Sequence, residues 1–397
     1  MKWEKVTIKD ICTGIYDGPH ATPPLSDTGA IFLGISNFNN GRLDFSDIRY
    51  ISEDDLPKWT KRVVPQKNDI VFSYEATLNL YAIIPEGFRG CLGRRMALLR
   101  VDETKAYYKF LYYYFYSDAW RATVNENIVL GATVDRIPLI KFPNFPVELP
   151  PLETQHRIAD ILSAYDDLIE NNQRQIKLLE EAAQRLYKEW FVDLRFPGHE
   201  NTKIVDGVPE GWSKSTVGNI CKLRKVVVTP DKIESNTPYI GLEHMPRNDI
   251  CLSMWGKSEE INSNKFIYLK KDVLFGKIRP YFHKVGFALN DGITSTDTMV
   301  MVADQNLWGL LLVTVSSDAF VDFSYQNCKE GAKMPRADWK QMEKYAIMIA
   351  DQATQKLFEQ EILVITNRIR ALAFQCRSLR EARDRMLPKL MGGEVEV

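Results

Sequence analysis

The stretch from Ile158 to Trp190 constrains this chain most, because its seam positions recur at alternating steps of four and three residues. That spacing is the heptad period of a coiled-coil helix. The seam positions are Ile158, Leu162, Tyr165, Ile169, Asn172, Ile176, Leu179, Ala183, Leu186 and Trp190. The pattern therefore predicts one long helix that needs a helical partner.

A second seam with the same rhythm stands 200 positions later in the chain. Its positions are Phe358, Ile362, Ile365, Ile369, Leu372, Cys376, Leu379, Arg383, Met386 and Leu390. This agreement indicates a duplication, with two long helices that pair with each other. We expect the second helix to end near Leu387, because proline at position 388 lacks a backbone N–H and clashes with the preceding turn. The tail from Glu394 is expected to fray.

The segments before the two helices also repeat. Trp3-x-Lys5-x-Thr7 returns as Trp212-x-Lys214-x-Thr216, and Gly131-Ala132 returns as Gly331-Ala332. Short apolar runs between turn-forming residues predict strands, and the tyrosine-rich stretch 105–120 predicts a helix packed on a sheet. The predicted fold is α+β, with two globular domains in a pseudo-twofold repeat, each followed by a long helix. The expected boundaries are domain 1 at 1–150, first helix at 151–192, linker at 193–211, domain 2 at 212–350 and second helix at 351–391.

Two arrangements of the helices are open at this point. Antiparallel pairing, as a coiled coil, would place the globules at opposite ends of a rod of roughly 45 to 58 Å, at about 1.5 Å per residue. That length is about one and a half turns of B-DNA. Parallel pairing would place both globules at one end and give no such spacing.

Composition places limits on the class of protein. The chain has 397 residues, a net charge of −1 and six cysteines without CxxC spacing, which favours free thiols over disulfides or zinc. No run approaches the roughly 18 apolar residues of a membrane span, and the first residues lack the apolar core of a signal peptide. A cytoplasmic location without membrane contact is expected.

Catalytic motifs are missing from the sequence. It contains no GxGxxG, GxxxxGK[ST], HExxH or GxSxG pattern, and its five histidines are far apart. Paired carboxylates of a nuclease, such as Glu75 with Glu86 or Asp291 with Asp297, are the weaker alternative. We therefore expect no catalytic residue, no metal site and no cofactor bound by this chain.

Two basic stretches point to nucleic acid. Residues 264–290 hold six Lys or Arg, one acid and six aromatic residues, and residues 88–100 hold four arginines and no acid. Cations contact phosphates, and aromatic or forked polar side chains contact bases. An ordinary solvated strand face is the competing interpretation.

Several motifs together resemble the specificity subunit of type I restriction-modification enzymes. They are Pro150-Pro151-Leu152-Glu153-Thr154-Gln155, Trp190-Phe191-Val192-Asp193, Pro209-Glu210-Gly211-Trp212, Phe72-Ser73-Tyr74-Glu75 and Leu274-Phe275-Gly276-Lys277-Ile278-Arg279-Pro280-Tyr281. The resemblance covers essentially the whole chain. It implies two target recognition domains that read the two halves of an interrupted sequence in double-stranded DNA, with the antiparallel helices as spacer.

The resemblance also implies partners. Two modification subunits, which bind S-adenosylmethionine and methylate adenine, would dock through the helices. Restriction subunits would add ATP-driven translocation and Mg-dependent cleavage. The alternative is a coiled-coil scaffold protein without sequence-specific DNA binding.

Candidate site residues follow from residue type and position. The DNA-binding candidates are Tyr74, Arg94, Arg95, Arg136, Lys277, Arg279, Tyr281, His283, Lys333 and Arg336, with structural ion pairs as the alternative for each cation. Apolar residues beside the seams are the partner-binding candidates: Ile161, Leu168, Leu178, Val364 and Phe374. A stripe wider than a two-stranded coil needs favours additional helices, although contact with the chain's own globules would also explain it.

Overall fold

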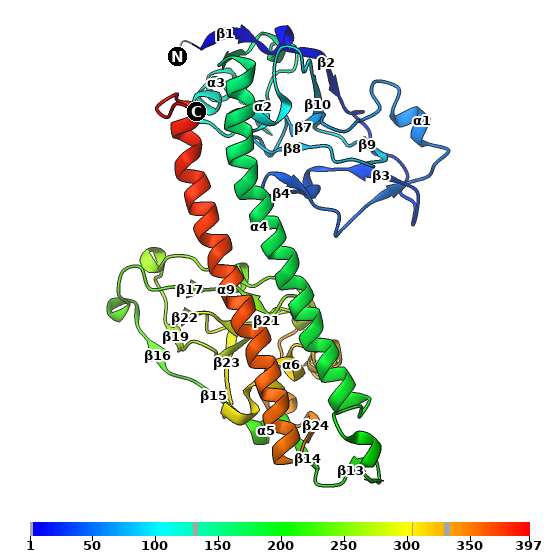
Figure 1. The fold of residues 1–397 in the computed structure, drawn as a ribbon, viewed down its shortest axis with the longest axis vertical. Helices are drawn as coiled ribbons and strands as arrows, with labels where there is room; N and C mark the ends of the chain where they lie inside the picture. The colour runs from blue at the N-terminus through cyan, green and yellow to red at the C-terminus, as the bar shows by residue number, and fades with distance from the viewer. Residues whose placement is uncertain (1–2, 130–133, 304, 329–333) are drawn as a thin grey trace. The chain divides into compact units, whose positions relative to one another are not determined.

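The computed structural model describes residues 3–129, 134–303, 305–328 and 334–397 (Figure 1). Contacts group the chain into two units. The first unit holds residues 1–167 and 379–397, and the second holds residues 168–378. Each unit therefore takes helix segments from both halves of the sequence, a grouping that differs from the expected division into consecutive domains.

The first unit is built on a four-stranded sheet in the order β2-β10-β7-β8. These strands are β2 (Cys12–Asp17), β10 (Met96–Val101), β7 (Ile70–Ser73) and β8 (Tyr81–Ile83). A three-stranded sheet has the order β6 (Tyr50–Ile51), β3 (Ala30–Leu33) and β9 (Gly90–Leu92). A hairpin joins β4 (Phe38–Asn39) to β5 (Arg42–Leu43), and β1 (Glu4–Thr7) pairs with β11 (Pro146–Leu149). Its short helices are α1 (Leu56–Trp59), α2 (Tyr108–Tyr114) and α3 (Asp118–Asn127).

Strand β7 shows why this sheet is buried on both faces. Ile70 and Phe72 face the core cluster that holds α2 and α3, whereas Val71 faces the cluster around Leu33. Alternate residues of a strand point to opposite faces, so a continuous apolar run needs cover on both sides. The predicted helix at 105–120 is two helices, because Ser117 accepts a hydrogen bond from Trp120 N at 3.3 Å and caps α3.

The second unit repeats this plan. Its five-stranded sheet has the order β15-β23-β20-β21-β18, with β15 (Cys221–Leu223), β23 (Thr298–Ala303), β20 (Val273–Gly276), β21 (Val285–Ala288) and β18 (Cys251–Leu252). A second sheet has β16 (Val227–Val228), β19 (Lys265–Tyr268), β22 (Gly292–Thr294) and β17 (Tyr239–Ile240), and β14 (Ser213–Thr216) pairs with β24 (Ala346–Ile349). The short helices are α5 (Val217–Ile220), α6 (Trp308–Val315), α7 (Asp318–Gln326) and α8 (Trp339–Met342). The shared strand order confirms the α+β duplication.

The two long helices are α4 (Leu152–Tyr187), which continues into a π-helical turn (Lys188–Val192), and α9 (Gln352–Met391). In the second unit the rings of Trp190 and Phe358 lie 5.6 Å apart, and the Asn172 amide donates to Gln375 Oε1 at 3.5 Å. Residue numbers thus rise along α4 as they fall along α9, which makes the pair antiparallel. The contact with Gln375 also accounts for the polar Asn172 in the seam.

In the first unit, the charged seam position Arg383 has partners. Its Nη1 donates to Asp166 Oδ1 at 2.5 Å, and Tyr113 Oη donates to the other carboxylate oxygen at 2.6 Å. Paired and hydrogen-bonded charges can occupy a largely buried position at lower cost than an isolated charge.

The expectation that the second helix ends near Leu387 is wrong. Helix α9 runs through Pro388 to Met391, and Gly392 N donates to Pro388 O at 2.8 Å. Leu390 and Met391 are buried in the first unit's core, so their packing outweighs the local cost of proline. Val395 and Val397 pack against the same core, so the tail is not frayed.

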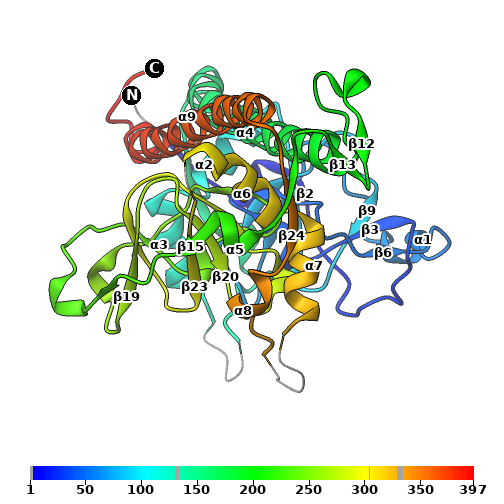
Figure 2. The ribbon, with the colours of Figure 1, turned by 90° about the horizontal axis from the view of Figure 1, so that it is seen from below.

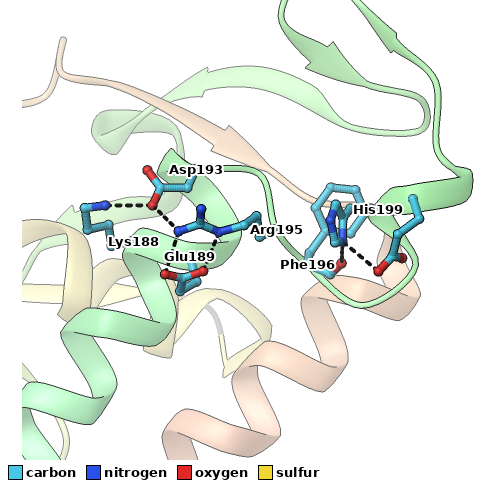
Figure 3. A network of polar contacts seen from close by, with 7 residues as sticks. Lys188, Glu189, Asp193, Arg195, Phe196 and His199 are labelled. Carbon is cyan, nitrogen blue, oxygen red and sulfur yellow. Dashed lines mark hydrogen bonds and ion pairs between the residues drawn. The ribbon is translucent and has the colours of Figure 1, made fainter.

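Ion pairs and hydrogen bonds fix the segment that follows α4 (Figure 3). Lys188 Nζ lies 2.6 Å from Asp193 Oδ2, and Arg195 contacts both Glu189 oxygens at 2.6 and 2.7 Å. The His199 Nδ1 atom lies 2.9 Å from the Phe196 carbonyl oxygen. A two-stranded ribbon of β12 (Ile204–Val205) and β13 (Val208–Pro209) follows. None of the helices in the described ranges is long and apolar enough to cross a membrane.

Buried carboxylates tie both long helices to the second globule. Glu359 on α9 accepts from Gly309 N and Leu310 N at 2.6 and 3.0 Å, in the first turn of α6, which Figure 2 shows between the long helices and the sheet of β20 and β23. Glu180 on α4 accepts from Ile250 N and Cys251 N at 3.0 and 2.8 Å. Burial, and after it the charge of Asp249, raises the pKa of Glu180 to about 7.

This raised pKa predicts that the contribution of Glu180 to the stability of the protein falls with rising pH. The folded state binds a proton at Glu180 more tightly than the unfolded chain does, so the contribution is fully present below the ordinary pKa of 4.5 and is lost as pH rises to about 7. The loss is roughly 3 kcal/mol, because each tenfold change in proton affinity corresponds to about 1.4 kcal/mol. Urea unfolding at a series of pH values should show this slope for the native chain and a shallower slope for Glu180→Gln. Parallel profiles for the two proteins would contradict the assignment.

Candidate nucleic-acid interface

Three loops meet at one edge of the main sheet in the first unit. The end of β7 contacts the turn before β10, because Tyr74 N donates to Arg95 O at 3.1 Å. It also contacts the chain before β11, where Ala76 N donates to Asp135 O at 3.0 Å and Ile137 N donates to Tyr74 O at 2.8 Å. We call this arrangement the loop junction.

The second unit forms the same junction with the same three main-chain hydrogen bonds. Lys277 N donates to Asp297 O, Arg279 N to Pro335 O and Ala337 N to Lys277 O, each at 2.8 Å. Main-chain bonds do not depend on side-chain identity. The junction is therefore a scaffold that can present different side chains in the two units.

The first unit's junction gathers three of the predicted arginines. Arg94 is exposed at the tip of the turn, Arg95 Nε lies 3.1 Å from Glu75 Oε1, and the exposed Arg136 forms a β-bridge with Glu75. Arg95 adopts a left-handed backbone with φ of 73°. The ion-pair alternative thus holds for Arg95, whereas Arg94 has no ion pair with any described residue.

The second unit's junction also carries cations. Arg336 Nη1 lies 2.8 Å from Asp297 Oδ1, and Lys277 Nζ donates to Thr296 O at 2.7 Å. Burial lowers the pKa of Lys277; the nearby cations Lys225 and Arg336 lower it further, and Asp297 opposes both. A carboxylate and three cations share this site, which leaves a net positive charge.

The turn after β20 holds the remaining predicted residues of this unit. Tyr281 is 46% exposed and packs edge-on against Phe282 and Tyr325, with ring centroids 4.8 and 5.2 Å away. Arg279 and His283 both adopt left-handed backbones, with φ of 51°. The turn carries both Tyr281 and Arg279, and their contact with DNA stays a prediction.

His283 is placed differently from the prediction. Its Nε2 atom lies 2.9 Å from Ser316 O, its Nδ1 atom lies 3.4 Å from Asp318 Oδ1, and its side chain is only 13% exposed. Both ring nitrogens are used to hold the turn against the start of α7. In this conformation the side chain is a positioning group for the turn.

Tyr74 also departs from the prediction. Its side chain is 5% exposed and belongs to the first unit's core cluster. Burial, and then the charges of Asp17 and Glu75, raises the pKa of its hydroxyl. A buried tyrosine cannot reach a base or phosphate without a rearrangement, so Tyr74 supports the junction from below. Lys333 and the repeated Gly-Ala pairs lie outside the described residues.

The apolar candidates on the helices divide into two groups. Leu168, Leu178 and Val364 are 52%, 59% and 68% exposed. Ile161 is partly covered by the first unit's core, and Phe374 packs on Trp255 at 6.2 Å between ring centroids. Contact with the chain's own globules therefore accounts for Ile161 and Phe374, and it leaves the other three uncovered among the described residues.

Sequence reasoning missed cations that the fold brings to these surfaces. Arg62 pairs with Asp17 beside the first junction, and Lys225 lies near Lys277 in the second. Arg247 stacks on Phe282, with its Cζ 4.1 Å from the ring centroid. Arg62 follows Lys61 and Lys225 follows Arg224, so both stand in short basic runs of the sequence, whereas Arg247 has no neighbouring lysine or arginine and a search for basic clusters cannot find it. The described residues hold no group of three or more His, Cys, Asp or Glu side chains placed to bind a metal ion.

Comparisons with known proteins agree with this architecture. Residues 1–181 match the family model of the type I restriction modification DNA specificity domain. The chain is 24% identical to the type I restriction enzyme MjaIX specificity subunit of Methanocaldococcus jannaschii, over 88% of this chain and 82% of the relative. It is 30% identical to the MjaVIII specificity subunit of the same organism, over 61% of this chain and 49% of that relative.

A solved structure shares the fold over nearly the whole chain. The S subunit of a type I restriction-modification system from M. genitalium aligns with a TM-score of 0.56 at 16% identity, covering 98% of this chain and 96% of that one. The architecture is thus that of two globules with two long helices. Residues 1–181 thus match the DNA specificity domain of type I restriction-modification systems, and the chain is similar in sequence to specificity subunits of these systems over most of its length.

The burial of Tyr74 generates a prediction. Its hydroxyl has no hydrogen-bond partner among the described residues, so Tyr74→Phe breaks no protein contact. An unsatisfied buried hydroxyl costs on the order of 1 kcal/mol. We expect the variant to keep DNA affinity and to be equally stable or up to about 1 kcal/mol more stable. DNA titration of the reconstituted complex and urea unfolding check this; a tenfold loss of DNA affinity with normal stability would restore Tyr74 as a contact residue.

Proposed function

We propose that this chain is the DNA sequence-recognition subunit of a type I restriction-modification complex and reads a bipartite site, one half with each unit. The observation that carries this proposal is the loop junction, which recurs with the same three main-chain hydrogen bonds in both units. The side chains at this junction differ between the units: Glu75 pairs with Arg95 in the first, and Asp297 pairs with Arg336 in the second. One scaffold with two sets of side chains suits the reading of two different half-sites.

The chemistry of the complex is assigned to partner subunits. Two modification subunits would supply S-adenosylmethionine and adenine methylation, and restriction subunits would supply ATP- and Mg-dependent cleavage. The sequence of this chain has no phosphate-cradling or nucleophile motif, which supports a recognition role. Its net charge of −1 is compatible with DNA binding if the partners share the neutralisation of phosphates.

The exposed residues of the long helices support a docking role. The apolar side chains of Leu168, Leu178 and Val364 are more than half exposed on the long helices. Apolar residues at such positions fit the packing of further helices. A scaffold without DNA binding would need the helices alone, and it would leave the net positive second junction without a role.

Methylation mapping tests the proposed function. Genomic DNA from a host that expresses this chain with its modification subunit should carry methylated adenine at one bipartite motif. The motif should disappear when the chain is deleted. Methylation that persists without the chain, or that never depends on sequence, would overturn the proposal.

Charged substitutions test the docking surface. The double variant Leu178→Glu and Val364→Glu should weaken binding to the modification subunit at least tenfold, because two carboxylates would lie in an apolar interface. Gln173→Glu is the matched control, since it adds a carboxylate at an exposed position on another face of α4. Titration calorimetry gives both affinities. Equal affinity for the double variant and the control would place docking elsewhere on the chain.

A further inference from the structure

The second unit carries a cation–aromatic arrangement that begins at Arg279 of the loop junction and extends to Arg247. The guanidinium carbon of Arg247 lies 4.1 Å from the centre of the Phe282 ring, and that of Arg279 lies 5.8 Å from the same centre. Because the two distances share the ring centre, the two carbons cannot be more than 9.9 Å apart. A guanidinium stacked on an aromatic face keeps its in-plane N–H groups free to donate.

Neither arginine is neutralised by the protein. Within the described ranges, Arg247 and Arg279 form no ion pair with a carboxylate, and Arg247 is exposed. A third cation, Lys284, is close enough for Arg247 to lower its pKa, after the larger effect of burial, while Glu243 acts in the opposite direction. Three cations and one carboxylate leave a positive charge that an anion would balance.

The backbone is arranged to hold this cluster. Arg279 has a left-handed conformation with φ of 51°, which costs a non-glycine residue on the order of 1 kcal/mol. The conformation is fixed by the bond from Arg279 N to Pro335 O and by Phe282 N, which donates to Arg279 O at 2.9 Å. The turn thereby brings Phe282 back under the Arg279 side chain.

The first unit has the same turn without the cations. Its left-handed residues are Ala76 and Asn79, with φ of 71° and 61°. Residues 73–80 contain no lysine or arginine, whereas residues 276–284 contain Lys277, Arg279 and Lys284. The charge on this turn is therefore a property of the second unit alone and is not required by the fold.

We propose that Arg247 and Arg279, seated on Phe282, bind a backbone phosphate of the DNA in the second unit's half-site. This inference rests on the proposed function and adds a sequence-independent anchor to it. Phosphates follow one another at about 3.4 Å of rise along a strand, so guanidinium groups this close can serve one phosphate or its neighbour. Phosphate contacts fix register and orientation, and the bases are then read by other side chains.

The experiment measures the salt dependence of DNA binding by the reconstituted complex with its modification subunit. A fluorescent duplex of mixed sequence is titrated at several salt concentrations. Arg247→Gln should make the negative slope of log affinity against log salt shallower by about 0.9, because one phosphate contact is lost. Arg247→Lys keeps the charge and should keep the slope.

Arg377→Gln is the matched control, because Arg377 also stacks on an aromatic ring, that of Trp255, with its Cζ 4.4 Å from the ring centre. The control should leave the slope unchanged. The affinity ratio between the duplex carrying the mapped methylation motif and the mixed duplex should also be unchanged in Arg247→Gln. An unchanged slope, or a lowered ratio that indicates base reading, would overturn the inference. Failure of the native complex to prefer its motif would instead overturn the proposed function.

Discussion

The burial of the α4 seam against α9 is the constraint on which the rest of the structure depends. Ile158 and Leu162 are buried in the first unit's core together with Leu390, and Ala183 is buried in the second unit's core together with Phe358. Each core is thus completed by helix residues from both halves of the sequence. A change that shortens either helix would expose apolar surface in both units, which ties the stability of the globules to an intact antiparallel pair.

The loop junction shows how a duplicated scaffold can diverge. Its three main-chain hydrogen bonds are the same in both units, whereas the turn before β10 supplies Arg95 and the turn before β23 supplies Asp297. The sign of the ion-pair partner is reversed accordingly: Arg95 pairs with Glu75 in the first unit, and Asp297 pairs with Arg336 in the second. Because the main-chain bonds do not require particular side chains, substitutions at these positions can change what is contacted without disturbing the loops.

Periodicity and repetition predicted the α+β duplication and the two long helices, because burial along a helix leaves a regular pattern in the sequence. Features that depend on tertiary contacts could not be predicted from periodicity or repetition. The sequence predicts a helix end at Pro388, but the burial of Leu390 and Met391 in the core keeps the helix intact past it. The sequence also predicts contact residues at Tyr74 and His283, but both side chains are largely buried in the structure. Arg247 lies 35 residues from Phe282 in the sequence, so no local pattern joins them. The spacing between the half-sites stays a prediction.

Exchange of one recognition domain tests the central claim most directly. Residues 212–350 would be replaced by the corresponding segment of a family member with a different target, and methylated motifs would be mapped in a host that expresses the chimera with the modification subunit. The account predicts that one half of the motif changes to that of the donor while the other half is retained. A motif that is unchanged, or changed in both halves, would contradict the assignment of one half-site to each unit.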